Sequence, residues 1–241
     1  MRRHLKTPVG YGFARLARAA VCAIALAGCT PHEQLLMALI PDGTFSVLMS
    51  NLETTSDTNR QRLTELDAQG DWKGMLAFAE ENLARDPFSS DWWLVKGYAY
   101  TRLGQHRQAA ECYSEMVRRS PDDMLGWNLL AESQRAMGQS ARAVQTLDNA
   151  LLIRRDSAAT WYILGQSYFD LGRDQPAAQA YHEAVQLNRS FAQAWYGLGR
   201  VYARQGHRSD FEQVVRTLEQ INPALAQQLA KEYTGAGPTR K

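Results

Sequence analysis

Apolar residues recur at helical spacing along residues 56–233, and turn-forming residues interrupt them at regular intervals. Residues 56–89 hold two such runs separated by Gly70, with apolar side chains three or four residues apart at Leu63, Leu66, Met75, Phe78, Ala79 and Leu83. Residues 90–123, 124–157, 158–191 and 192–225 repeat the arrangement, each with a glycine between two helical segments. The pattern predicts an all-α chain built from successive helix pairs.

The helix pairs follow a fixed period of 34 residues. One tryptophan and one glycine recur at that interval: Trp93, Trp127, Trp161 and Trp195, and Gly70, Gly104, Gly138, Gly172 and Gly206. Pro87, Pro121 and Pro223 share a third position of this register, where Arg155 and Arg189 stand in the other two repeats. Residues 56–89 carry Asn59 in place of tryptophan, so the first repeat is degenerate.

Residues 161–188 show the fullest form of the repeat, with Trp161, Leu164-Gly165, Tyr168, Ala177 and Tyr181. This order and spacing resemble the signature of tetratricopeptide repeat (TPR) proteins. The resemblance covers roughly residues 56–223. It implies an all-α TPR solenoid, a right-handed superhelix of antiparallel helix pairs.

The turns and caps of the helices follow from the residues at the repeat junctions. Each register glycine is expected to leave the first helix at positive φ, which is unfavourable for a residue with a Cβ. Asp71, Ser140 and either Ser209 or Asp210 are expected to cap second helices. Pro176 falls in the first turn of its helix, where a missing N–H is harmless.

Small residues predict a close approach of the two helices in each pair. They are Gly97, Ala131, Gly165 and Gly199 on first helices and Ala109, Ala143 and Ala177 on second helices. The last repeat departs at Phe211, Val215 and Leu218, which indicates a different neighbour. A capping helix over residues 223–233, with Leu225 and Leu229 on one face, supplies that neighbour, and residues 234–241 are expected to be a disordered tail.

The four tryptophans are expected to pack between helices as core residues rather than to form a platform for bases or sugars. Cys112 is the one cysteine of the repeats, so no disulfide can form within them. It is expected to be a small packing residue. The histidines are scattered, and no metal-binding spacing occurs.

The positive charge of the chain is confined to its N-terminus. Five of the 27 basic residues lie in residues 1–28, which contain no acidic residue. The remaining 22 basic residues face 25 acidic ones, a net charge of −3. Without a basic stripe on the repeats, no nucleic-acid partner is expected.

Residues 1–28 combine a basic start with a short apolar run over residues 19–27, too short to span a bilayer as a stable helix. The run ends in Leu26-Ala27-Gly28-Cys29, which resembles the lipobox of bacterial lipoproteins. The resemblance implies a signal peptide over residues 1–28 and lipid attachment at Cys29. In that family Thr30, rather than aspartate, implies the periplasmic face of the outer membrane. An ordinary signal peptide or uncleaved anchor, and an organelle transit peptide, are the alternatives.

Residues 29–55 lie between the predicted anchor and the repeats. Apolar runs over residues 35–40 and 45–49 flank the turn-forming sequence Pro41-Asp42-Gly43. A flexible tether would be polar, so short helices that cover the open end of the solenoid are expected. Insertion into the bilayer and binding of a partner are the alternatives.

The TPR resemblance also implies a partner-binding groove lined by the first helix of each repeat. In the family, the second, fifth, ninth, twelfth and thirteenth positions of that helix contact ligands. Carried onto this sequence, they include Leu94, Tyr98, Arg102, Asn128, Glu132, Arg135, Tyr162, Gln166, Phe169, Asp170, Tyr196, Arg200 and Arg204. This mixture suits an extended peptide or an amphipathic helix. Leu94 and Tyr98 stand where carboxylate-clamping TPR proteins carry Lys and Asn, which argues against that ligand, and intramolecular contact is the alternative role for each position.

The resemblance implies a non-enzymatic scaffold or assembly factor, similar to the outer-membrane TPR lipoproteins that help to build pili and secretins. An adaptor for peptidoglycan hydrolases or proteases is the alternative. The sequence shows no nucleophile–base set, metal spacing or phosphate loop, so no cofactor, metal or small-molecule substrate is expected. An enzyme of another kind is the remaining alternative class.

Overall fold

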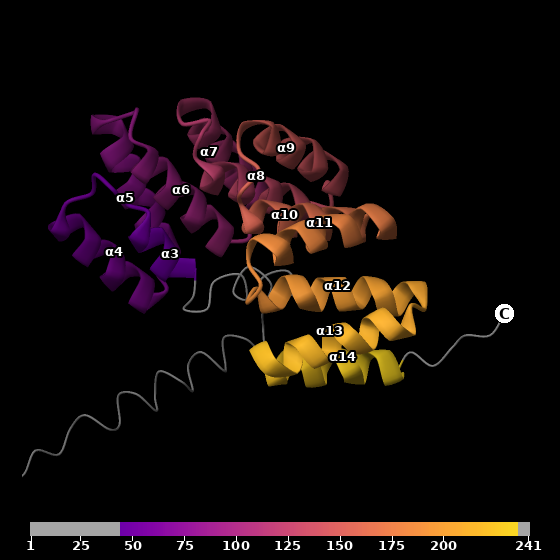
Figure 1. Ribbon diagram of the computed structural model, residues 1–241. Coiled ribbons are helices and arrows are strands. Elements are labelled where there is room, and N and C mark those ends of the chain that lie inside the picture. Colours follow the sequence, from indigo (N-terminus) through magenta and orange to yellow (C-terminus); the bar gives the residue numbers. More distant parts are fainter. Residues whose placement is uncertain (1–43, 236–241) are drawn as a thin grey trace, which may run out of the picture. The chain divides into compact units, whose positions relative to one another are not determined.

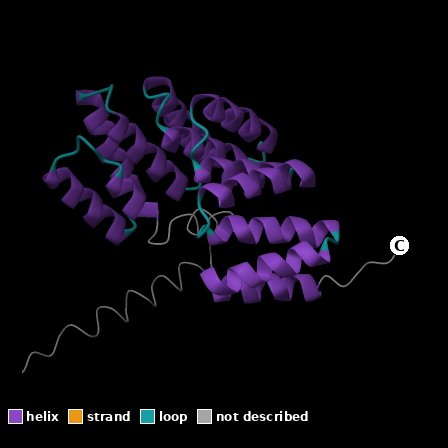
Figure 2. Ribbon diagram, viewed as in Figure 1, coloured by secondary structure: helices purple, strands orange, loops and turns teal. Residues whose placement is uncertain are grey.

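The computed structural model describes residues 44–235, so the predicted signal peptide and Cys29 lie outside the described residues. Helices and loops make up this part of the chain, and no strand occurs in it (Figure 2). The helices are α3 (Thr44–Ser50), α4 (Asp57–Gln69), α5 (Trp72–Arg85), α6 (Ser90–Arg102), α7 (His106–Arg119), α8 (Met124–Ala136), α9 (Ser140–Ile153), α10 (Ala158–Asp170), α11 (Asp174–Leu187), α12 (Ala192–Gln205), α13 (Arg208–Ile221) and α14 (Pro223–Gly235).

From α4 to α13 the helices form five successive pairs, each joined by a short turn (Figure 1). Each helix packs against the next along the chain, and first helices also meet one another where α8 contacts α10 and α10 contacts α12. We call the surface formed by the first helices α4, α6, α8, α10 and α12 the first-helix face. Among residues 44–235, no helix has the length and apolar character needed to cross a membrane.

The register glycines end the first helices as predicted. All five have φ between +66° and +73°, and no other residue in the described part has a positive φ. The N–H of Gly104 donates to the carbonyl of Thr101 at 3.0 Å, and the N–H of Gln105 donates to that of Tyr100 at 2.9 Å. These bonds satisfy carbonyls that the end of the helix leaves without an intrahelical donor.

Each second helix begins two residues after its register glycine, which corrects part of the capping prediction. Asp71 is an N-cap, and its Oδ1 accepts a 2.8 Å hydrogen bond from the N–H of Gly74. In the later repeats the same register position holds Gln139 and His207, neither of which makes a side-chain capping bond. Ser140 is therefore the first helical residue of α9, and Ser209 and Asp210 lie inside α13, because the chain enters the helix soon after the left-handed glycine.

The atoms nearest to Gly97 and Gly165 on the first helices belong to tyrosine rings of the second helices, a contact that the predicted small-residue pairs did not include. A Cβ on Gly97 would lie 2.4 Å from Cε1 of Tyr113, and one on Gly165 would lie 2.7 Å from Cδ1 of Tyr181. Both tyrosines lie one turn beyond the predicted alanines and are buried. A large ring on one helix therefore fills the space that a missing side chain leaves on its partner.

The four register tryptophans are half-buried and connect successive repeats, whereas the sequence predicted that they would be core residues. Each indole Nε1 donates to the carbonyl of the residue six positions earlier: Trp93 to Pro87 at 3.1 Å, Trp127 to Pro121 at 2.8 Å, Trp161 to Arg155 at 2.8 Å and Trp195 to Arg189 at 2.9 Å. The bond uses only a backbone carbonyl, which proline and arginine both provide. This explains why arginine can replace proline in the register.

The last pair packs against α14, as the departures in the last repeat predicted. Leu229 of α14 is 1% exposed, and a Cβ on Gly199 would meet its Cδ2 at 2.4 Å. The rings of Phe211 and Tyr233 stack with their centroids 4.3 Å apart. Exposed polar residues of α14, including Gln227 and Lys231, give the end of the array a polar surface.

Candidate partner-binding face

The predicted partner positions divide into three groups along the first-helix face. The first group lies on α6 and is engaged within the protein. Leu94 and Tyr98 are only 5% and 7% exposed. The Tyr98 hydroxyl donates to Oδ1 of Asp67 at 2.9 Å, and the Arg102 guanidinium lies 4.4 Å from the centroid of the Trp72 ring.

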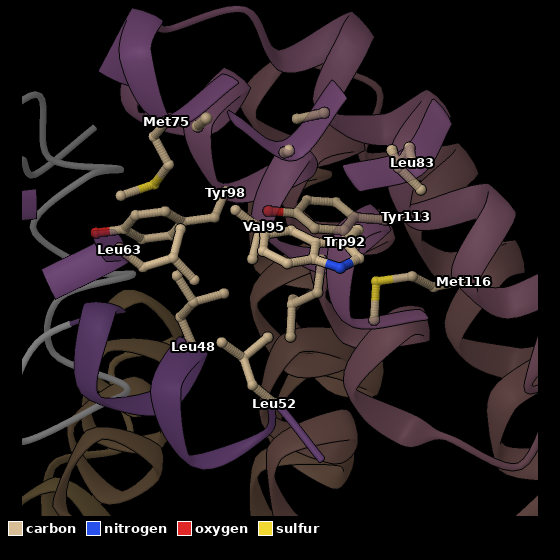
Figure 3. Packing of buried hydrophobic residues seen from close by; sticks show 14 of the residues in the cluster. Leu48, Leu52, Leu63, Met75, Leu83, Trp92, Val95, Tyr98, Tyr113 and Met116 are labelled. Atoms are coloured by element: carbon tan, nitrogen blue, oxygen red, sulfur yellow. The ribbon is translucent and has the colours of Figure 1, made fainter. Parts of the chain in front are cut away.

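Residues 45–55 contribute to the burial on α6. The ring of Phe45 packs against Tyr98 with a centroid distance of 6.2 Å, and Leu48 and Leu52 belong to the same buried cluster as Leu94 (Figure 3). Residues 45–55 therefore pack against the first repeats, whereas residues 29–43 of the predicted cap lie outside the described part. Two polar residues that hold this segment, Arg60 and Asp91, were missed among the predicted site residues.

The second group forms a buried charged network between α8 and α10. Nη1 of Arg135 donates to both carboxylate oxygens of Glu132, at 2.9 and 3.1 Å, and to Oε1 of Gln166 at 2.6 Å. Its Nε and Nη2 both donate to Oδ2 of Asp170, at 2.9 and 2.8 Å. Burial disfavours charge on Arg135, but the two carboxylates outweigh burial and raise its pKa.

The network continues to Tyr162, whose hydroxyl accepts a 2.7 Å hydrogen bond from Nε2 of Gln166. Tyr162 is 2% exposed, and its ring packs against Tyr181 and Phe191. Burial raises the pKa of its hydroxyl well above the ordinary value. Beside the network, Oδ1 of Asn128 accepts a 2.9 Å bond from the hydroxyl of Thr160. These bonds join α8 to α10, so much of the predicted groove serves contacts between repeats.

The third group lies on α10 and α12 and retains exposed charge. The guanidinium groups of Arg200 and Arg204 lie 4.5 and 3.7 Å from the ring centroid of Phe169. Arg204 also forms an ion pair with Asp174, whereas Arg200 makes no ion pair within residues 44–235. Both arginines are exposed. We call Phe169, Arg200 and Arg204 the arginine stack.

Tyr196 lies one turn before the arginine stack and contacts α14. Its hydroxyl donates to Oε1 of Glu232 and accepts a 2.9 Å hydrogen bond from Nε2 of Gln228. Burial, reinforced by the Glu232 carboxylate, raises the pKa of this hydroxyl. Tyr196 is half-buried, so it borders the exposed part of the face without being free of internal contacts.

A separate pocket of about 420 Å³ lies between α9, α10 and α11. Its lining includes Leu152, which is 77% exposed, together with Trp161 and Tyr168. Burial raises the pKa of Asp148 at its edge. None of the predicted partner positions lines this pocket.

No group of residues suited to bind a metal ion occurs in the part of the chain that the structure describes. Cys112 is 3% exposed, in line with the predicted packing role. Burial raises the pKa of its thiol to about 12, so the thiolate needed for nucleophilic chemistry is scarce at neutral pH.

Comparison with known proteins agrees with the helical-repeat architecture. The family descriptions "Tetratricopeptide repeat" and "TPR repeat" match residues 90–133 and residues 165–206. No curated protein sequence matches the chain.

Several solved structures, two of them described as TPR proteins, are similar in fold at low sequence identity. MamA is 19% identical with a TM-score of 0.58, over 75% of this chain and 99% of MamA. TTC0263, a thermophilic TPR protein of Thermus thermophilus, is 20% identical with a TM-score of 0.56, over 73% and 95%. YrrB, described as a TPR protein with an unusual peptide-binding site, is 16% identical with a TM-score of 0.55, over 78% and 98%. The fold is therefore an all-α TPR solenoid.

Proposed function

We propose that this chain is a non-catalytic scaffold that binds another protein on the first-helix face of α8, α10 and α12. The exposed arginine stack is the observation that carries this proposal. Stacking on Phe169 holds two guanidinium groups in place before a partner arrives, which reduces the side-chain entropy lost on binding. The N–H groups in the guanidinium plane of Arg200 remain suited to a carboxylate.

The partner that fits is a peptide segment or helix with an acidic side chain near its contact with Arg200. Asp170 and Asp174 lie in the same region, so the surface carries both signs of charge rather than a uniform basic patch. Such a mixture favours a partner of matching charge pattern and disfavours polyanions. The similarity to YrrB, whose description mentions a peptide-binding site, agrees with a peptide ligand.

The proposed location is the periplasmic face of a bacterial outer membrane, with the chain anchored through a lipid on Cys29. An anchor would raise the effective concentration of partners in the same membrane. Replacing Cys29 with alanine should abolish fatty-acid labelling and release the protein from membranes. Persistent labelling of the Cys29→Ala variant would reject the anchor.

Affinity capture from envelope extract, followed by mass spectrometry, tests the scaffold proposal. The Arg200→Ala/Arg204→Ala variant should lose partners that the wild-type chain captures. Arg208→Ala/Arg216→Ala is the matched control, because it removes two exposed positive charges from α13 instead. Tyr162 is unsuitable as a target because it is buried and its replacement would disturb the fold.

The identity of the captured proteins separates the two candidate pathways. Secretin or pilus proteins lost by the Arg200→Ala/Arg204→Ala variant would support an assembly factor, and hydrolases or proteases would support an adaptor. Equal capture by that variant and the α13 control would exclude the arginine stack as the binding site.

A further inference from the structure

Residues 45–55 lie on the first-helix face of α4 and α6 as a short helix followed by a turn. Phe45 and Leu48 lie three residues apart on α3, Leu52 follows the end of that helix, and Leu48 and Leu52 are 2% and 1% exposed. Figure 3 shows Leu48 and Leu52 within the cluster that contains Val95 and Tyr98. The segment thus covers positions on α6 that the repeat pattern predicts for a partner.

The carboxylate of Asp91 on α6 binds the backbone and hydroxyl groups of this segment. Its Oδ2 accepts hydrogen bonds from the N–H of Thr54 at 2.8 Å, the hydroxyl of Thr54 at 3.0 Å and the hydroxyl of Thr55 at 2.8 Å. Its Oδ1 accepts a bond from the N–H of Glu53 at 3.3 Å. Asp91 is 6% exposed and makes no ion pair within the described residues, so residues 53–55 compensate its charge.

Arg60 on α4 binds the carbonyl groups of the same segment. Nη1 donates to the carbonyl of Met49 at 2.8 Å, Nε donates to that of Thr55 at 3.2 Å, and Nη2 donates to that of Leu52. The Asp91 carboxylate thus accepts from N–H and O–H groups of residues 53–55, and the Arg60 guanidinium donates to carbonyl groups within residues 49–55. Recognition of the main chain in this way is typical of peptide-binding surfaces.

Both binding residues stand at register positions that face the predicted groove in other repeats. Arg60 shares its position with Leu94, Asn128, Tyr162 and Tyr196. Asp91 shares its position with Asp57, Leu125, Ala159 and Gln193, and only the first two repeats carry a charge there. The charged pair is therefore specific to the place where residues 45–55 lie and is not a general feature of the repeat.

We propose that residues 45–55 are an intramolecular peptide ligand, bound to a recognition surface made by Arg60, Asp91 and Tyr98. The segment opens and closes as a unit, and it blocks this surface while it is bound. The surface fits a short helix with apolar residues at i and i+3, followed by a non-helical stretch that presents an apolar residue at i+7 and then N–H donors. In the closed state, partner binding is confined to the repeats that follow. The inference stands apart from the arginine stack and does not depend on it.

Hydrogen exchange of the full chain tests whether the segment opens independently. The N–H groups of Glu53 and Thr54 should exchange at least tenfold faster, relative to their intrinsic rates, than those in the middle of α9. Their exchange should change little with low concentrations of denaturant, because local opening exposes little surface. Exchange of both sets with the same protection and the same denaturant dependence would show that residues 45–55 open only when the whole domain unfolds, and would overturn the proposal.

A second experiment tests recognition directly with a fluorescent peptide of residues 44–56. Leu48→Asp/Leu52→Asp in the full chain should expel the segment, so this variant should bind the peptide at least tenfold more tightly than wild type. Adding Asp91→Asn to the variant should weaken binding, as should replacing both threonines of the peptide with valine. Equal binding by wild type and variant, or binding that survives loss of Asp91, would contradict the proposal. If the double variant fails to fold, the exchange measurement on wild type decides the question.

Arg200→Ala/Arg204→Ala keeps this test separate from that of the proposed function. The variant should leave both the exchange of Thr54 and the binding of the peptide unchanged, because its substitutions lie on α12. Loss of partner capture with normal peptide binding would therefore concern the arginine stack alone.

Discussion

The guanidinium of Arg135 donates two hydrogen bonds to a single oxygen of Asp170, from Nε at 2.9 Å and from Nη2 at 2.8 Å. These two hydrogen bonds connect α8 with α10, the first helices of two successive repeats. Because Nη1 also contacts Glu132 and Gln166, Arg135 compensates a buried carboxylate and a half-exposed one at the same time. The repeats are thus joined by charge as well as by apolar packing.

Replacing Arg135 with methionine should destabilise the protein by about 3–5 kcal/mol, because it removes the guanidinium that binds the buried carboxylate of Glu132. Adding Glu132→Gln should recover part of the loss, since the buried charge is then absent. Urea unfolding monitored by tryptophan fluorescence measures both changes. Arg142→Ala, an exposed position on α9, is the control and should stay within about 0.5 kcal/mol of wild type. A similar loss for the single and double variants would refute this account of the network.

The period of 34 residues was sufficient to predict the helix pairs and the positive φ of the glycines, and the departures from it in the last repeat indicated the helix after residue 223. It was not sufficient to predict the environments of the polar residues. Arg135 and Tyr162 share a register with partner-binding positions, yet they bond to the neighbouring repeat or pack within the protein. A repeat pattern specifies the face on which a side chain lies, whereas its partner there depends on residues about 30 positions away in the chain.

The tryptophans and Asp91 show two further limits of the sequence. A large aromatic residue suggests burial, but the indole N–H needs an acceptor, and the nearest one is a carbonyl in the half-exposed loop between repeats. Asp91 stands at the second position of its first helix, which contacts ligands in the family, but it was not among the predicted site residues, although its charge was a signal that could have been used. Its role depends on residues 53–55, which do not follow the repeat, so periodicity gave no account of it.

Gly97→Ala should destabilise the protein by about 1–3 kcal/mol, despite the higher helix propensity of alanine. The new Cβ would lie 2.4 Å from the Tyr113 ring, so the two helices of the pair must separate or the ring must move. Gly126→Ala is the matched control, because the nearest atom there, Cβ of Met116, lies 3.3 Å away. Thermal unfolding should rank the control closer to wild type. The reverse ranking would show that the Tyr113 ring does not limit this position.

Cys112 should resist alkylation in the folded protein. Burial raises the pKa of its thiol from 9.0 to about 12, which lowers the thiolate fraction at pH 8 by about a thousandfold. Iodoacetamide labelling at pH 8, quantified at Cys112 by mass spectrometry, should be slow in buffer and fast in urea. Site-specific detection separates Cys112 from Cys22 and Cys29 of the same chain. Equally fast labelling with and without urea would mean that the thiol is accessible in the native state.

Asp67→Asn should alter how stability depends on pH. Burial raises the pKa of Asp67, against the hydrogen bond from Tyr98 and the charge of Arg102. A raised pKa in the folded state means that this carboxyl contributes most to stability below its unfolded value, and that the contribution is lost as pH rises through the folded value. Asparagine keeps an oxygen that can accept the Tyr98 bond and cannot ionise. The stability of the variant relative to wild type should therefore increase from about pH 4 to pH 7, as measured by urea unfolding at a series of pH values.

Tyr98→Phe provides the opposite change at the same site. It removes the donor that favours the ionised carboxylate, so the pKa of Asp67 should rise further and the loss of stability should move to higher pH. The double variant Asp67→Asn/Tyr98→Phe should lack this pH-dependent component altogether. Parallel pH profiles for wild type, Asp67→Asn and Tyr98→Phe would show that Asp67 does not contribute to the pH dependence. In that case, the contribution of Tyr98 would rest on the packing of its ring with Phe45 of α3 and Trp72 of α5.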